Sequence, residues 1–247
     1  MRFALRSVGL TYGDGHVLHA HSHHWGQLIF AISGTMRVEA ANALWLVPPG
    51  RALWAPPQIV HEIEMRGTVA MRTIYVPPDR TARLPCQCTA VEVDALLREL
   101  ILHIVARQML IEGAQADERL AGVFLDQLAA APSLVLHLPM PRDARARGLA
   151  EKLWADPADG RTLPAIARSA ALSARTVQRI FQDETGMRFV EWRQRQRLIH
   201  AITALHAGLN VTQAGAAAGY ASTSAFIAAF RQQMGETPAR YLKLKQR

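Results

Sequence analysis

The chain has 247 residues, of which 50% are apolar, and it carries a formal net charge of +8. This length allows two domains with separate cores, whereas no apolar run reaches the roughly 20 residues that a membrane-spanning helix needs. The composition therefore argues against a helical membrane protein. We expect a cytoplasmic chain without a signal peptide, in which the only two cysteines, Cys86 and Cys88, are ordinary thiols.

Residues 1–82 contain closely spaced segments of strand-forming residues. Turn residues such as Ser33-Gly34 and Pro48-Pro49-Gly50 separate these segments. Short strands at such spacing are typical of an all-β barrel or sandwich. The predicted strands cover residues 27–33, 35–40, 43–47, 61–65 and 69–76.

A group of histidines lies close to these predicted strands. His21 and His23 are two residues apart, so on a strand both would point to the same face, and His61 begins a later strand. Together with the amide oxygen of Gln27, the three imidazoles form a ligand set that suits zinc, nickel, iron or manganese. The alternative is a small-molecule pocket in which the histidines are hydrogen-bonding groups. Three tryptophans of this region would then form the pocket wall or the core: Trp25, Trp45 and Trp54.

The spacing of these residues resembles the two motifs of the cupin barrel. Segment 21–34 reads His-x-His-x3-Gln-x6-Gly, like the first motif, and segment 50–61 is similar to the second. The first motif normally has glutamate where this chain has Gln27, and the exchange removes a negatively charged ligand. The resemblance implies a cupin-like β-barrel that senses a small molecule or a metal. The candidate metal ligands are His21, His23, Gln27 and His61.

A helical pattern follows the strands. Apolar residues recur at helical spacing over 91–105, and a second helix is predicted over 119–130. We assign residues 83–141 to a helical connector that caps the barrel, pairs with a second copy of the chain, or does both. Asp143 is placed to act as the N-cap of a helix that continues to about residue 155.

Two stretches in the last third of the chain match each other at an offset of 49 residues. Ser173 aligns with Ser222, and Phe181 aligns with Phe230. Each copy is a short apolar helix, a tight turn and an amphipathic helix closed by glycine, which predicts two helix-turn-helix units. The units cover residues 163–186 and 211–235, and one amphipathic helix over 189–207 joins them.

The positive charge is confined to the part of the chain that contains this repeat. Residues 142–247 hold 17 Lys and Arg against 8 Asp and Glu, a charge of +9, whereas residues 1–141 hold 11 against 12, a charge of −1. A polyanionic partner such as double-stranded DNA explains the asymmetry. The alternative is a set of solvated helix faces in an arginine-rich protein.

The second helix of the first unit presents one polar face. This face has side chains at i, i+3, i+4 and i+7, namely Arg175, Gln178, Arg179 and Gln182. Arginine can bond guanine through two hydrogen bonds, and glutamine can do the same for adenine. We therefore expect this helix to read bases.

The equivalent face of the second unit consists of Ser224, Ile227, Ala228 and Arg231. It lacks a side chain that could form two hydrogen bonds to a base at its centre. We therefore expect the first unit to supply most of the direct readout and the second unit mainly to position the domain on the backbone.

Several motifs occur in order through residues 142–247. They include the run Leu172-Ser-Ala-Arg-Thr-Val-Gln-Arg-Ile-Phe181, the pair Gly219-Tyr220, and Gly235-Glu-Thr-Pro238 followed by Tyr241. In this respect the segment resembles the DNA-binding domain of the AraC/XylS family of transcription regulators. The resemblance implies RNA polymerase as a further partner. It also implies base-contacting positions at Arg175, Gln178, Arg179, Thr223, Ser224, Ile227 and Ala228.

The sequence as a whole predicts an α+β protein of two domains. A cupin-like β-barrel is followed by a helical connector and by an all-α domain, residues 142–247, with two helix-turn-helix units joined by a long helix. The predicted function is a sequence-specific transcription regulator with a small-molecule or metal effector, not an enzyme, and the leucine-rich stretch 96–104 favours a homodimer. Two alternatives remain: a metal-dependent cupin enzyme of the dioxygenase type with an accessory DNA-binding domain, and a structural DNA-binding protein.

Overall fold

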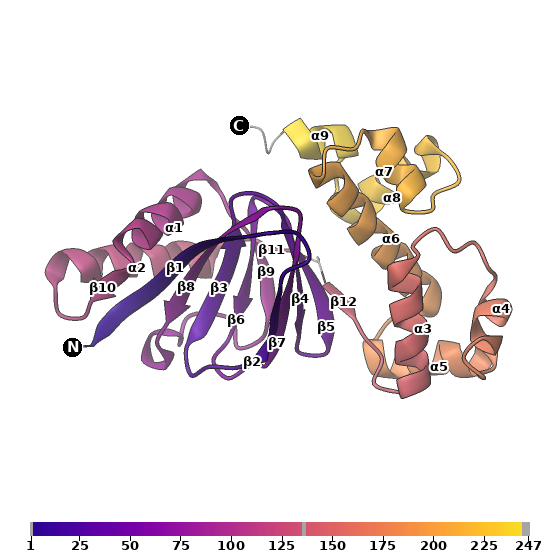
Figure 1. Ribbon diagram of the computed structural model, residues 1–247, viewed down its shortest axis with the longest axis horizontal. Coiled ribbons are helices and arrows are strands. Elements are labelled where there is room, and N and C mark those ends of the chain that lie inside the picture. The colour runs from indigo at the N-terminus through magenta and orange to yellow at the C-terminus, as the bar shows by residue number, and fades with distance from the viewer. Residues whose placement is uncertain (1, 135–136, 244–247) are drawn as a thin grey trace. The chain divides into compact units, whose positions relative to one another are not determined.

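The computed structural model describes residues 2–134 and 137–243, and the chain divides into two compact units (Figure 1). The first unit ends at His137 and the second begins at Leu138. The first unit combines sheets with two α-helices, and the second is helical. The α+β architecture predicted from the sequence is therefore confirmed. Most of the segment 83–141 that the sequence assigned to a connector belongs to the first unit.

Two antiparallel sheets form the framework of the first unit. The larger has the strand order β10-β1-β8-β3-β6-β9-β11 and the smaller the order β12-β5-β4-β7-β2. Within the described residues the two sheets remain separate, so the predicted barrel takes the form of two facing layers. The strands are β1 (Phe3–Tyr12), β2 (Val17–His21), β3 (Gly26–Ala31), β4 (Thr35–Ala40), β5 (Ala43–Val47), β6 (Arg51–Ala55), β7 (His61–Arg66), β8 (Val69–Val76), β9 (Thr89–Glu92), β10 (Met109–Ile111), β11 (Ser133–Leu134) and β12 (His137–Pro139).

Strand β3 is buried on both faces, which explains its nearly continuous apolar sequence. Leu28 and Phe30 belong to the core cluster that the helices α1 (Ala95–Arg107) and α2 (Gln115–Ala130) share with the larger sheet. Gln27 points the other way, toward the smaller sheet, where its side chain meets that of His61. The polar side chain of Gln27 thus lies between the layers.

Helix α1 packs on the larger sheet through one apolar stripe. Asp94 caps it by accepting a hydrogen bond from the backbone N–H of Leu97. Leu97, Ile101 and Ile104 are buried in the cluster formed with the sheet, whereas Leu96 is 51% exposed. Packing on the sheet therefore accounts for most of the leucine-rich stretch. Figure 1 shows α1 and α2 together on one side of this sheet.

The second unit confirms the helix-turn-helix repeat. Ser173 and Ser222 cap corresponding helices, and each of these helices ends at a left-handed glycine, Gly186 or Gly235. Asp143 caps the first helix of the unit, as predicted. The helices are α3 (Ala144–Ala155), α4 (Leu163–Arg168), α5 (Ala174–Thr185), α6 (Phe189–His206), α7 (Val211–Ala217), α8 (Thr223–Met234) and α9 (Pro238–Lys243). In the described part of the chain, no helix has the length and apolar character needed to span a membrane.

Candidate functional site

Three histidines meet between the two sheets. His21 ends β2 and lies opposite His61, the first residue of β7, with 4.5 Å between the ring centroids. The sequence placed His21 and His23 on one strand, but β2 ends at His21. The turn that follows brings His23 to the same place, 5.3 Å from the His61 ring. One ligand atom from each ring lies within 4.8 Å of the other two.

The backbone fixes which nitrogen each ring presents to this centre. The Nδ1 atom of His21 lies 2.7 Å from the carbonyl oxygen of His19, that of His23 lies 2.6 Å from the oxygen of Trp25, and that of His61 lies 2.9 Å from the oxygen of Ile59. Because a carbonyl oxygen only accepts, each Nδ1 carries a proton and donates it. In the neutral rings, Nε2 is therefore an unprotonated lone pair.

The orientation of the Gln27 amide is fixed by a similar argument. The hydroxyl of Thr73 donates to the carbonyl oxygen of Leu28 at 2.9 Å, so its oxygen must accept from the Gln27 amide nitrogen, also at 2.9 Å. The amide oxygen of Gln27 then points to the histidines. It lies 2.9 Å from Nε2 of His23 and 2.9 Å from Nε2 of His61.

In the neutral rings, three acceptor atoms therefore converge: Nε2 of His23, Nε2 of His61 and the amide oxygen of Gln27. Burial away from water lowers the pKa of His61 to about 4, although the hydrogen bond to Ile59 acts in the opposite direction. His61 is only 1% exposed and Gln27 only 2%, so their facing atoms are shielded from bulk water. Lone pairs that face each other at 2.9 Å in a buried site repel, whereas a cation placed between them attracts all of them.

A cavity of about 820 Å³ opens beside the histidines. His23, Trp25 and Tyr75 line it. Of the three tryptophans considered as wall residues, only Trp25 does so, because Trp45 and Trp54 are 7% and 0% exposed and belong to the core.

In the second unit, α5 exposes the polar face that the sequence predicted. Arg175, Gln178, Arg179 and Gln182 are all exposed, whereas the opposite side of the helix is buried. Arg179 forms an ion pair with Asp183 at 3.4 Å, and both side chains are more than half exposed. Such a pair contributes little to stability, so Arg179 is free to turn toward another acceptor.

Helix α8 presents a less polar face. Ser224, Ala228 and Arg231 are exposed, and Thr223 and Ile227 are half-buried. A shallow hollow follows this face and also includes Gln232 and Thr237, which the sequence analysis did not single out. Gln232 follows Ala228 at i+4, so the helical spacing alone could have included it.

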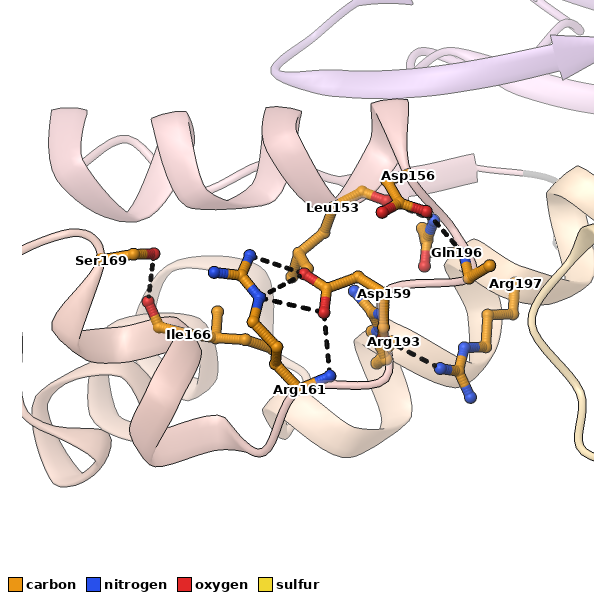
Figure 2. Close-up of polar contacts among 10 residues, drawn as sticks. Leu153, Asp156, Asp159, Arg161, Ile166, Ser169, Arg193, Gln196 and Arg197 are labelled. Carbon is orange, nitrogen blue, oxygen red and sulfur yellow. Dashed lines mark hydrogen bonds and ion pairs between the residues drawn. The ribbon is translucent and has the colours of Figure 1, made fainter.

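The arginines of α6 hold the second unit together internally. Arg193 is buried and donates to the backbone carbonyl of Asp159, and Arg197 donates to the same oxygen at 3.4 Å (Figure 2). Arg197 also donates to the carbonyl oxygen of Pro157 at 3.2 Å. The Asp159 carboxylate pairs with Arg161 at 2.7 Å. These contacts fasten the loop between α3 and α4 to α6, so part of the positive charge of this unit serves its own structure.

The same loop also reaches the second helix-turn-helix unit. Gly219, in the turn between α7 and α8, has a φ of +79°, and a Cβ added there would lie 2.7 Å from the Cα atom of Ala158 and from the carbonyl oxygen of Pro157. One loop therefore contacts both α6 and the turn that precedes α8.

Sequence reasoning missed the residues that support the histidine cluster. Thr73 and Tyr75 both contact the Gln27 amide from β8. They occur at alternate positions of an otherwise mainly apolar strand, which was the available signal. Arg6 of β1 lines the cavity beside Tyr75 and was also missed, because β1 itself was not predicted.

Comparisons with known proteins agree with these two parts. Residues 7–129 match the family described as AraC-like ligand binding domain, and residues 166–244 match the family described as helix-turn-helix domain. The chain is 33% identical over 222 residues to the HTH-type transcriptional regulator NimR of Escherichia coli K12, covering 90% of this chain and 81% of NimR. It is 37% identical over 122 residues to the HTH-type transcriptional regulator RipA of Corynebacterium glutamicum, covering 49% of this chain and 35% of RipA. ToxT of Vibrio cholerae O395 aligns over 97% of each chain with 13% identity and a TM-score of 0.41.

Proposed function

The chain belongs to the AraC family of DNA-binding transcription regulators, and on this premise we propose that its first unit responds to a divalent metal ion and that α5 supplies most of the base readout. Family membership gives DNA binding, transcription regulation and an N-terminal ligand-binding domain. The matched families and the relatives named above describe regulators, and none describes the cupin enzyme considered as the alternative.

The convergence of acceptor atoms carries the metal proposal. His21, His23 and His61 would hold the ion through Nε2, and Gln27 would hold it through its amide oxygen. A bound divalent cation would supply the positive charge that this group of lone pairs lacks. The carbonyl groups that accept from each Nδ1 support the proposal, because such bonds orient imidazole ligands and raise their basicity.

Calorimetric titration with Zn²⁺ and Ni²⁺ tests this proposal. We expect one equivalent to bind the wild-type chain and binding to be lost in His61→Ala and His21→Ala. His21 is exposed, so its removal leaves the core intact. His103→Ala is the matched control, since His103 is exposed on α1 away from the cluster. The proposal would be overturned if the wild-type chain bound neither ion stoichiometrically, or if the wild-type chain and the three variants bound the ions equally.

Further partners follow from the regulator function. We propose that the DNA-bound chain acts through RNA polymerase in the cytoplasm, where the chromosomal DNA of a bacterium lies. Leu96 on α1 and Val123 on α2 support the expectation of a homodimer, because they are 51% and 46% exposed on the helical side of the first unit. Sedimentation of the wild-type chain and of Leu96→Glu with Val123→Glu tests this expectation.

A further inference from the structure

The cavity beside the histidine cluster has the character of a second binding site. We propose that it binds an amphipathic carboxylate, a small molecule with an apolar body and one negatively charged carboxyl group. The proposal rests on the sensor function of the first unit, because His23 belongs both to the cavity wall and to the histidine cluster. The volume, about 820 Å³, lies within the range of small-molecule sites.

The charge of the cavity wall favours an anion. Arg6 and Arg72 line the cavity, and no aspartate or glutamate does. The guanidinium of Arg6 lies 5.4 Å from the centroid of the Phe3 ring, and in the described part of the chain we find no carboxylate paired with it. Arg72 donates to the carbonyl oxygens of Met71 and Leu10, which do not neutralise its charge. Carboxylates are the common partners of such planar guanidinium groups.

Tyr75 provides a neutral hydrogen-bond donor next to these charges. Its hydroxyl oxygen accepts from the Gln27 amide at 3.4 Å, which leaves the hydroxyl proton for a ligand. Arg6 and Tyr75 lie opposite each other on the paired strands β1 and β8, so one carboxyl group can contact both.

Apolar side chains form another part of the wall, beside the polar residues Ser7, His23 and Gln108. Val8, Leu10 and Met109 are 39%, 47% and 38% exposed, and all three line this cavity together with Trp25 and Val105. Such a concentration of exposed apolar side chains marks a binding surface. The strand pairing explains the opening. The pairing of β1 with β10 ends at Arg6. Beyond Arg6, β1 pairs only with β8 among the described strands, so its other edge is open.

Calorimetry with 2-naphthoate, performed first on metal-free protein, tests the proposal. The uncharged 2-naphthamide has the same apolar body and serves as the ligand control. We expect 2-naphthoate to bind at least tenfold more tightly than 2-naphthamide, and Arg6→Gln to lose at least tenfold in naphthoate affinity. Arg2→Gln is the control variant, because Arg2 is an exposed arginine near Arg6 in the sequence that does not line the cavity.

The outcomes separate this proposal from the metal proposal. Equal affinity for the two ligands, unchanged affinity in Arg6→Gln, or no binding of 2-naphthoate overturns the carboxylate site, whatever Zn²⁺ does. Loss of Zn²⁺ binding in His21→Ala with retained naphthoate binding supports two distinct sites. If the wild-type chain does not bind Zn²⁺ but binds 2-naphthoate more tightly than 2-naphthamide, only the metal proposal is overturned.

Discussion

Gln27 controls the character of the histidine cluster because its amide contacts both layers of the first unit. Its nitrogen donates to Thr73 on the larger sheet, and its oxygen meets His61 on the smaller one. An amide oxygen is a weaker ligand than a carboxylate, since it carries no net charge. If the cluster binds a divalent ion as proposed, Gln27 therefore makes this binding weaker than a glutamate at the same position would.

Replacement of Gln27 by glutamate should strengthen metal binding. The carboxylate adds a negative charge at a buried position that is 2% exposed, so it gains more from a cation than the neutral amide does. We expect the Kd for Zn²⁺ to fall at least about tenfold, equivalent to about 1.4 kcal/mol. Calorimetry measures the change, with Gln58→Glu as a control because Gln58 is exposed and outside the cluster. An equal or weaker affinity in Gln27→Glu would contradict the assignment of Gln27 as a ligand.

The residues of this site differ in how far the sequence could predict them. His21, His23 and Gln27 were identified because they lie within one short motif, and His61 was identified because segment 50–61 resembles the second cupin motif. Thr73 lies 46 residues beyond Gln27, and it meets the amide only because β8 pairs with β3. A single strand reveals which of its faces is polar, but it does not reveal the strand that will lie beside it.

At the scale of elements, α5 and α8 are equivalent in the repeat but differ in their exposed side chains. Arg179→Ala should relax sequence preference more than Ser224→Ala, because a bidentate arginine contact is worth about 1–3 kcal/mol of base discrimination. Competition between an upstream operator fragment and a scrambled duplex measures this preference. Arg119→Ala is the charge-matched control, since Arg119 is exposed on α2 in the first unit. Equal relaxation by Arg179→Ala and Ser224→Ala would contradict the asymmetry between the helices.

The turn between α7 and α8 offers a second test at this scale. Gly219→Ala combines a left-handed backbone with a Cβ placed 2.7 Å from two backbone atoms, whereas Gly235→Ala has the left-handed backbone and nothing within 4 Å. We expect a loss of about 1–2 kcal/mol for Gly235→Ala and about 2–5 kcal/mol for Gly219→Ala. Urea unfolding followed by helical circular dichroism measures both. Equal losses would show that the loop does not press against this turn.

Element prediction failed where local signals were interrupted. Strand β1 contains Gly9 and has no regular alternation of apolar and polar residues, and β6 is a short strand between two proline-containing turns. Both were missing from the predicted strands, although helices near 95–107 and 115–130 were found. Periodicity identifies an amphipathic helix, but it does not identify the surface that covers its apolar face. The core shared by α1, α2 and the sheet was therefore not predictable from the pattern alone.

At the scale of the whole molecule, the division of charge corresponds to the division into units. The near-neutral N-terminal part contains the histidine cluster and the cavity, and the part with a charge of +9 contains the two helix-turn-helix repeats. If Zn²⁺ acts as an effector by changing the DNA affinity of the full chain, the two units are coupled in free energy. The magnitude of such coupling is typically about 1–3 kcal/mol.

This coupling leads to a prediction for the full chain and for residues 138–247. Zn²⁺ should change the operator affinity of the full chain by about 5- to 150-fold, and the change should disappear in His61→Ala. The fragment 138–247 contains the second compact unit without the cluster, so its operator affinity should be the same with Zn²⁺ and with a chelator. Fluorescence anisotropy of labelled operator at constant salt measures all three affinities.

Thermodynamic linkage makes the prediction stricter. If Zn²⁺ changes operator affinity by a given factor, operator DNA must change the Zn²⁺ affinity of the full chain by the same factor. Calorimetric titration of Zn²⁺ into the chain with and without operator measures the second factor independently. Unequal factors, or a Zn²⁺ effect of the same size on the fragment, would mean that the ion acts through the DNA or through surface groups of the second unit. Equal factors that vanish in His61→Ala would assign the effect to the histidine cluster.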